Sequence, residues 1–176
     1  MEVRGHVTLN HRPVSSNIEI PENAQIATGP DGFALISVVP GSAVQIRANS
    51  TLDLGRTPDK GVSVNLHIGG IWSLLPHGSN YEVVTSAATA SVRGTQFYVH
   101  VDKRKGTDIC ACDGDVHMQT FDGKAFNQVI TSPNHDHHAY HFAKKRKKVV
   151  VKHRPNPAHT MEGEEDLVHA AESSRE

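Results

Sequence analysis

The sequence predicts an all-β fold, because short segments with alternating apolar residues are separated by frequent turn signals. The clearest alternation runs through residues 62–68, where every second residue is apolar. Glycine, proline, asparagine and aspartate cluster between such segments, as in the Gly-Pro-Asp-Gly sequence at residues 29–32. Short alternating segments bounded by turns are typical of a β-sandwich, a barrel or a short β-solenoid.

The expected strands follow one another along the first 130 residues, in which no helical period is visible. The segments with the strongest pattern are residues 33–38, 43–47, 62–68 and 96–101. In the third segment, Val62, Val64, Leu66 and Ile68 should face inward, since side chains alternate along a strand. Turn sequences such as Pro-Gly-Ser at residues 40–42 and Asp-Gly at residues 113–114 separate the segments.

Composition places the chain among ordinary globular domains. It has 176 residues and a net charge of -1, which gives no overall bias toward nucleic acid. Neither an apolar segment long enough to span a bilayer nor a secretory leader is visible. Residues 1–151 are expected to form one β domain, and residues 152–176 a flexible tail that could contain a short helix. The basic run at residues 144–148 is interpreted as a solvated face.

Five segments occur in an order that is typical of one family: GHVTLNHRPV at residues 5–14, IATGPDGFA at 26–34, PGSAVQIRANS at 40–50, GIW at 70–72 and YEVVTSAATASVRGTQF at 81–97. Together they resemble the FecR domain, a β domain named for a bacterial regulator of iron transport. The most specific part is the Val-Arg-Gly-Thr block that contains Arg93, Gly94 and Thr95. The sequence departs from the pattern at Ser86, where proline is usual, and at Pro40, where an acidic residue often stands.

The resemblance implies a non-enzymatic sensing or binding domain of the cell envelope. FecR domains are placed outside the cytoplasmic membrane, where they relay a signal between an outer-membrane receptor and an anti-sigma segment. A protein partner and a periplasmic or envelope location are therefore expected, and nucleic acid is not. The helical anti-sigma segment and the transmembrane helix of the family are not visible in this chain, so the regulatory output cannot be transferred to it.

The Val-Arg-Gly-Thr block has a structural interpretation. Gly94 lies in a strand context between Arg93 and Thr95, which indicates a bulge or a close approach of another backbone segment. Arg93 is expected to bond to carbonyl groups or to a carboxylate at a corner of the domain. These three residues are therefore treated as a structural motif.

The two cysteines of the chain, Cys110 and Cys112, are followed by a histidine-rich segment. On a strand both thiols point to the same face, with sulfurs about 6–7 Å apart from the strand rise. Cysteine and histidine are the usual ligands of tetrahedral zinc and also suit iron or haem. A Cys-x-Cys followed by a His-His pair resembles a subset of FecR-like sequences, which selects His137 and His138 as ligands. His135 and His141 are additional candidates.

Other interpretations of this segment remain open. Both cysteines could be small apolar core residues beside a solvated histidine loop, or they could form a reversible disulfide. In a second functional hypothesis the chain is a small metal-dependent or redox protein that uses Cys110, Cys112, His137 and His138. An open coordination position would favour that hypothesis, whereas a closed set of four ligands would favour a structural or sensing role.

Overall fold

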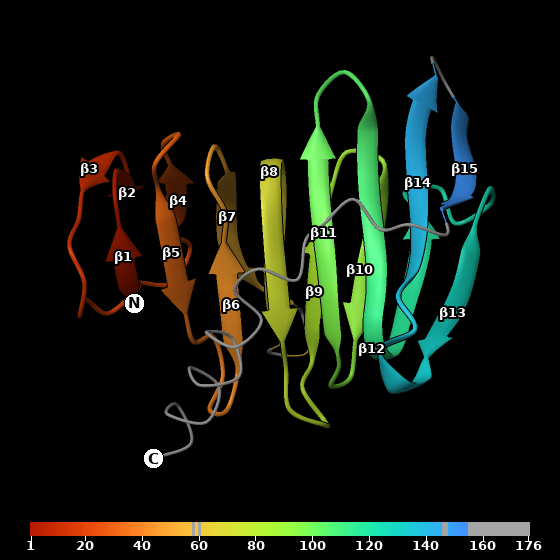
Figure 1. The fold of residues 1–176 in the computed structure, drawn as a ribbon, viewed down its shortest axis with the longest axis horizontal. Coiled ribbons are helices and arrows are strands. Elements are labelled where there is room, and N and C mark those ends of the chain that lie inside the picture. Colours follow the sequence, from red (N-terminus) through yellow and green to blue (C-terminus); the bar gives the residue numbers. More distant parts are fainter. Residues whose placement is uncertain (58, 60, 146–147, 155–176) are drawn as a thin grey trace.

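The computed structural model of the protein describes residues 1–57, 59, 61–145 and 148–154, and their regular structure is almost entirely β (Figure 1). The single helical turn in these residues is the 3-10 turn η1 (Pro133–His135). In Figure 1 the colours run in order from one end of the molecule to the other, because the chain adds strands progressively along one axis. The predicted all-β fold of sandwich and solenoid character is confirmed.

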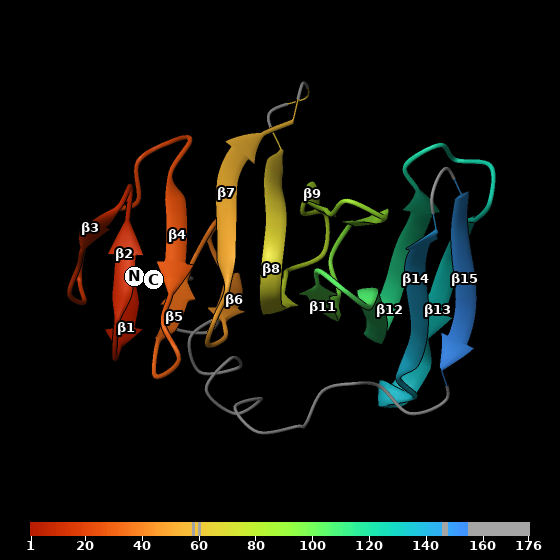
Figure 2. The same ribbon diagram turned by 90° about the horizontal axis from the view of Figure 1, so that it is seen from above.

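The strands form two layers, which Figure 2 separates when the molecule is seen from above. The front layer contains β1 (Glu2–Arg4), β5 (Phe33–Ile36), β6 (Ala43–Ile46), β11 (Gln96–Asp102), β14 (His138–Lys145) and β15 (Lys148–Arg154). The back layer contains β2 (Val7–Leu9), β3 (Arg12–Pro13), β4 (Gln25–Thr28), β7 (Thr51–Arg56), β9 (Tyr81–Val84), β10 (Ala88–Val92) and β13 (Asn127–Ser132). Among the strand pairings of the described residues, only that of β8 (Val62–Leu74) with β9 is parallel.

Two long strands, β8 (Val62–Leu74) and β12 (Gly106–Thr120), belong to both layers. The first half of β8 pairs with β7 and β9 in the back layer, and its second half pairs with β6 and β11 in the front layer. β12 crosses in the opposite direction, from β11 and β14 to β10 and β13. The crossings lie at Gly69 and Gly114, whose φ angles of 88° and 83° favour glycine. A Cβ on Gly69 would also come within 2.3 Å of Ser50 Oγ.

The main hydrophobic core fills the space between the two layers. Its largest side chains with less than 2% exposure include Tyr81, Phe97 and Phe142. The rings of Tyr81 and Phe97 meet edge to face with centroids 5.9 Å apart, an arrangement that adds to the stabilisation from burial. Of the four residues predicted to face inward, Val62, Val64 and Leu66 are buried, and Ile68, next to the crossing point, is half-buried.

A second cluster of buried residues lies on the outer face of the front layer, which is the face turned away from the back layer. It consists of Leu35, Ala43, Trp72, Tyr98, Cys110, Cys112 and Ala139. These residues alternate with core residues along each strand, as Trp72 does with Ile71. One cross-strand row runs through Gln45, Trp72, Tyr98, Cys110, Ala139 and Arg154.

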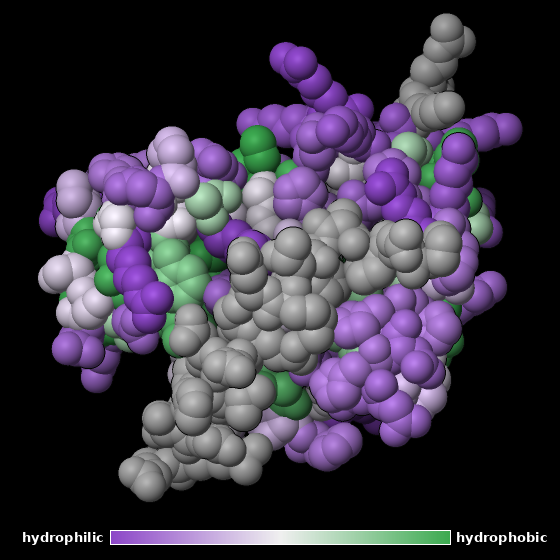
Figure 3. Space-filling view, in the orientation of Figure 1, coloured by the Kyte–Doolittle hydropathy of each residue, from purple (hydrophilic) through white to green (hydrophobic). Residues whose placement is uncertain are grey.

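The C-terminal part of the described chain extends past the predicted domain end at residue 151. β15 continues to Arg154, which pairs with Ala139 of β14. The expected flexible tail, apart from residues 152–154, lies outside the described residues. Within the predicted basic run, Lys144 and Lys148 are exposed, and hydrophilic side chains dominate this upper edge of the molecule (Figure 3). None of the helical structure in the described residues is long and apolar enough to cross a membrane.

Replacement of Phe97 by alanine should lower the free energy of unfolding by about 3–5 kcal/mol, because it removes a fully buried ring from the main core. Denaturation in urea, followed by circular dichroism, measures the loss. The matched control is Phe121→Ala, since Phe121 is 60% exposed and its loss should cost less than about 1 kcal/mol. Equal losses in the two variants would contradict the core described here.

Candidate metal centre

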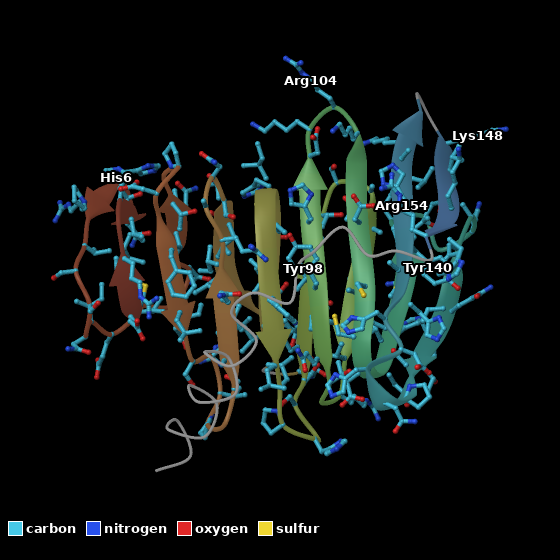
Figure 4. All side chains as sticks on the ribbon, viewed as in Figure 1. His6, Tyr98, Arg104, Tyr140, Lys148 and Arg154 are labelled. Atoms are coloured by element: carbon cyan, nitrogen blue, oxygen red, sulfur yellow. The ribbon has the colours of Figure 1, made fainter. Side chains whose placement is uncertain are left out.

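The two cysteines lie where β12 crosses from the front layer to the back layer. Cys110 pairs with Tyr98 on one side and Ala139 on the other, so it is central in the front layer. Figure 4 labels Tyr98 of β11 and Tyr140 of β14, the two strands that flank this part of β12. The exposures of Cys110 and Cys112 are 2% and 0%. Both residues are thiols rather than halves of a disulfide.

The sulfur atoms are closer together than the regular strand geometry predicts. Sγ of Cys110 and Sγ of Cys112 are 3.7 Å apart, not the expected 6–7 Å. The physical reason is a register shift between Gln96 and Phe97. The pairing of β11 with β12 skips Cys112 there, which is the signature of a β-bulge that bends the strand and re-aims a side chain.

His137 reaches the cysteines from the loop that precedes β14. Its Nδ1 atom lies 3.8 Å from Cys110 Sγ, and the donor atoms of Cys110, Cys112 and His137 all lie within 4.8 Å of one another. The three residues therefore form the group of potential metal ligands that the described part of the chain assembles. The thiols of Cys110 and Cys112 and the imidazole of His137 thus converge at one place, as predicted.

The loop that carries His137 has an unusual backbone. Asn134, His135 and His137 all have left-handed φ angles, of 56°, 58° and 54°. Such angles cost non-glycine residues of the order of 1–3 kcal/mol each, although asparagine and histidine tolerate them better than most. The loop begins at Ser132, whose hydroxyl donates a hydrogen bond of 3.3 Å to the carbonyl oxygen of Cys112. The loop is thus fastened to the cysteine strand just before its strained segment.

The other predicted ligands lie farther from the thiols or point away from them. His138 pairs with Ala111 of β12, a core residue, so its side chain lies on the opposite face from the cysteines. Its ring lies 6.3 Å from that of His153. His135 is exposed, and its ring centroid is 6.4 Å from that of His137. The structure therefore brings His137 to the cysteines and separates His138 from them.

His141 lies on the outer face, but a carboxylate holds its ring. Nδ1 of His141 is 2.8 Å from Asp108 Oδ1, and Arg154 Nε is 3.6 Å from the same oxygen. The His141 and Asp108 side chains are only 10% and 15% exposed. Asp108 was not singled out from the sequence, although its position two residues before Cys110 places it on the same strand face. The cluster lies beside the cysteines and does not include them.

Tyr98 lies between Trp72 and Cys110 in the cross-strand row of the outer face. Burial raises the pKa of its phenol above the usual value; the charge of Arg47 opposes this rise, while those of Asp108 and Cys112 add to it. The phenol therefore remains protonated at neutral pH and can donate a hydrogen bond. A Cβ on Gly70 would come within 2.6 Å of the Tyr98 hydroxyl oxygen, so Gly70 leaves the space that this ring needs.

The Val-Arg-Gly-Thr block forms the corner that leads into β11. Gly94 has a φ of 106°, and a Cβ on it would lie 2.3 Å from Cα of His77. The carbonyl oxygen of Arg93 accepts a hydrogen bond from the Gly78 amide, while the Thr95 hydroxyl donates to the carbonyl oxygen of Asp113. Thr95 thereby fastens β11 to the crossing point of β12. The close backbone approach expected at Gly94 is observed, and the Arg93 side chain is exposed.

The family of the chain follows from this segment and its surroundings. A family model described as FecR protein matches residues 24–117, which is more than half of the chain. The chain belongs to the FecR family. The match includes the Val-Arg-Gly-Thr corner and both cysteines of the FecR domain, but it ends before the loop that carries His137. The resemblance inferred from the sequence is confirmed.

Solved structures extend the comparison to the fold. Two crystal structures of a "putative anti-sigma factor" from Parabacteroides distasonis superpose with TM-scores of 0.59 and 0.55, at 14% and 15% sequence identity. Each match covers 74% of this chain and 59% of the other chain. At this identity the similarity shows the shared fold. No curated protein sequence matches the chain.

Replacement of Gly94 by alanine should destabilise the domain more than replacement of Gly78. Both glycines have positive φ angles, but a Cβ on Gly94 would collide with the backbone of His77, whereas a Cβ on Gly78 meets nothing within 4 Å. The positive φ alone costs alanine about 1–3 kcal/mol, so Gly78→Ala measures that part and the difference measures the collision. Thermal unfolding of the two variants should show a clearly lower midpoint for Gly94→Ala. Equal midpoints would exclude the close approach.

Proposed function

We propose that this FecR domain is a non-enzymatic regulatory domain of the bacterial cell envelope that acts by binding a protein partner. The observation that carries the proposal is the family match over residues 24–117. Further support comes from the fold that the chain shares with two crystal structures described as those of a "putative anti-sigma factor". By this analogy the chain works in the periplasm, and its effect on transcription, as in the regulation of iron transport, passes through the partner protein that it binds.

The Cys/His cluster supplies a site at which the proposed regulator would sense a metal ion. Cys110, Cys112 and His137 offer three donor atoms at one place on the front layer, and zinc and iron are the ions that such a donor set suits. Binding there would connect the loop at residues 133–137 to β12. The loop would then have one conformation with the ion and another without it, and a partner protein could bind the two conformations with different affinity.

One feature also favours the second functional class, a small metal-dependent or redox protein. Three protein donors leave a fourth coordination position for water or substrate, as in catalytic zinc sites. Such a site also requires a general base within hydrogen-bonding reach of the bound water. The nearby Asp108 carboxylate is already bonded to His141. The binding function is therefore the better supported of the two.

Deletion of the gene should change the abundance of a restricted set of transcripts, because the partner that the chain binds is proposed to relay its signal to transcription. RNA sequencing of deleted and complemented cells measures the effect, and osmotic-shock fractionation locates the protein. Complementation with the native gene should restore the transcripts, whereas the core variant Phe97→Ala should restore them less. An unchanged transcriptome, together with co-purification of the chain with a cytosolic marker, would refute the proposal.

A further inference from the structure

We infer that Sγ of Cys110, Sγ of Cys112 and Nδ1 of His137 bind one zinc ion, with His135 as the fourth ligand. The existence of this site depends only on the geometry of the four side chains. The regulatory role of the ion rests on the function proposed above. The proposed site holds a single zinc ion in a closed shell of four protein ligands.

The distances between the donor atoms already match a tetrahedral ion. Two sulfurs that lie 3.7 Å apart and each bond zinc at about 2.3 Å subtend an angle of about 107° at the metal. In the same geometry a sulfur and an imidazole nitrogen are separated by about 3.6 Å. The observed separation between Cys110 Sγ and His137 Nδ1 is 3.8 Å. Closing this small difference requires only a slight movement of the exposed loop.

Haem and iron–sulfur clusters fit the arrangement less well. Haem iron accepts protein ligands along its axis, on the two opposite faces of the macrocycle, whereas the donors of Cys110, Cys112 and His137 converge on one point. A two-iron cluster needs four protein ligands shared between separate irons. The donor set of two thiols and an imidazole is soft to borderline, which suits zinc and excludes the hard ions calcium and magnesium.

His135 is the side chain placed to complete the shell. It belongs to the same loop as His137, is exposed, and has its ring centroid 6.4 Å from that of His137. Two imidazoles on one tetrahedral zinc have centroids roughly 5 Å apart, given zinc–nitrogen bonds of about 2.0–2.1 Å. The rings of His135 and His137 must therefore approach each other by little more than 1 Å for both to bond one ion. Asn134 and His135 both have left-handed φ angles, so the backbone turns sharply just before His137.

A Cys₂His₂ shell of this kind would be structural or sensory rather than catalytic, because no position remains for a substrate. The ion would fasten the loop at residues 133–137 to the crossing point of β12. It would also offset the backbone strain at Asn134, His135 and His137, and the loop should relax when the ion leaves. The metal-dependent element of the domain is thus the loop between β13 and β14.

The test uses the full chain, purified under reducing conditions without added metal or chelator. Elemental analysis should find about one zinc per chain, and both the Cys110→Ser/Cys112→Ser variant and His137→Ala should lose it. His138→Ala is the matched control, because His138 is the neighbouring histidine and its side chain lies on the opposite face. This control should keep the full zinc content.

The role of His135 is tested separately, by the zinc affinity of a variant that lacks its imidazole. His135→Ala should still bind one ion when zinc is in excess, but its affinity should fall by at least about 10–100-fold, the range for loss of an outer-shell partner. Competition with a colorimetric chelator measures that change. Cobalt substituted for zinc should give the visible absorption of a tetrahedral ion and the charge-transfer bands of thiolate ligands. Loss of His135 should alter the tetrahedral bands and leave the thiolate bands in place.

Several results would overturn the inference. The first is a reduced protein whose melting temperature is not raised by zinc. The second is an equal loss of zinc in His138→Ala and His137→Ala. The other two are copper(I) as the bound ion and a disulfide between Cys110 and Cys112 in the native protein. Binding of a ligand only by the folded state must raise the melting temperature, so the first result is decisive even if a variant fails to fold. Zinc binding without any change in transcripts would refute the proposed function and leave the site intact.

Discussion

The structure depends on the passage of β8 and β12 from one layer to the other. Each strand is continuous, and each changes its partners at a glycine with a positive φ, Gly69 in one case and Gly114 in the other. These crossings fix how the two layers pack and therefore which residues enter the main core. Neighbouring residues pack tightly against both crossings. A Cβ on Gly69 would collide with Ser50, and a Cβ on Gly114 would collide with Thr95. A side chain at either glycine would push the layers apart.

The candidate metal centre is a by-product of the second crossing. A regular strand would hold alternate side chains about 6–7 Å apart, too far for both sulfurs to bond one ion. The register shift at Gln96/Phe97 bends β12 where Cys112 lies, and the sulfurs approach to 3.7 Å. The same turn of the chain brings Ser132 against Cys112 and starts the loop that carries His137. The bend that serves the fold thus also gathers the ligands.

The sequence predicted those parts of the fold that depend on local patterns. Alternation in residues 62–68 correctly indicated a strand, but it did not reveal that β8 continues to Leu74, because Gly69-Gly70 has the composition of a turn. At Ser86, where the family usually has proline, the turn is held by the Thr85 hydroxyl, which accepts hydrogen bonds from the amides of Ala87 and Ala88. The choice between His137 and His138 could not be made from spacing, since it depends on left-handed φ angles in the preceding loop.

The order of the strands along the molecule affects how the domain can unfold locally. Strands advance from one end of the molecule to the other (Figure 1), so each strand pairs with strands that are only a few places away from it in chain order. Proteins built in this quasi-one-dimensional way can open from one end while the remainder stays folded. The candidate centre lies near the C-terminal end of this series, between β12 and β14. An ion bound there would link the last strands to β12. Local unfolding of that end and loss of the metal would then occur together.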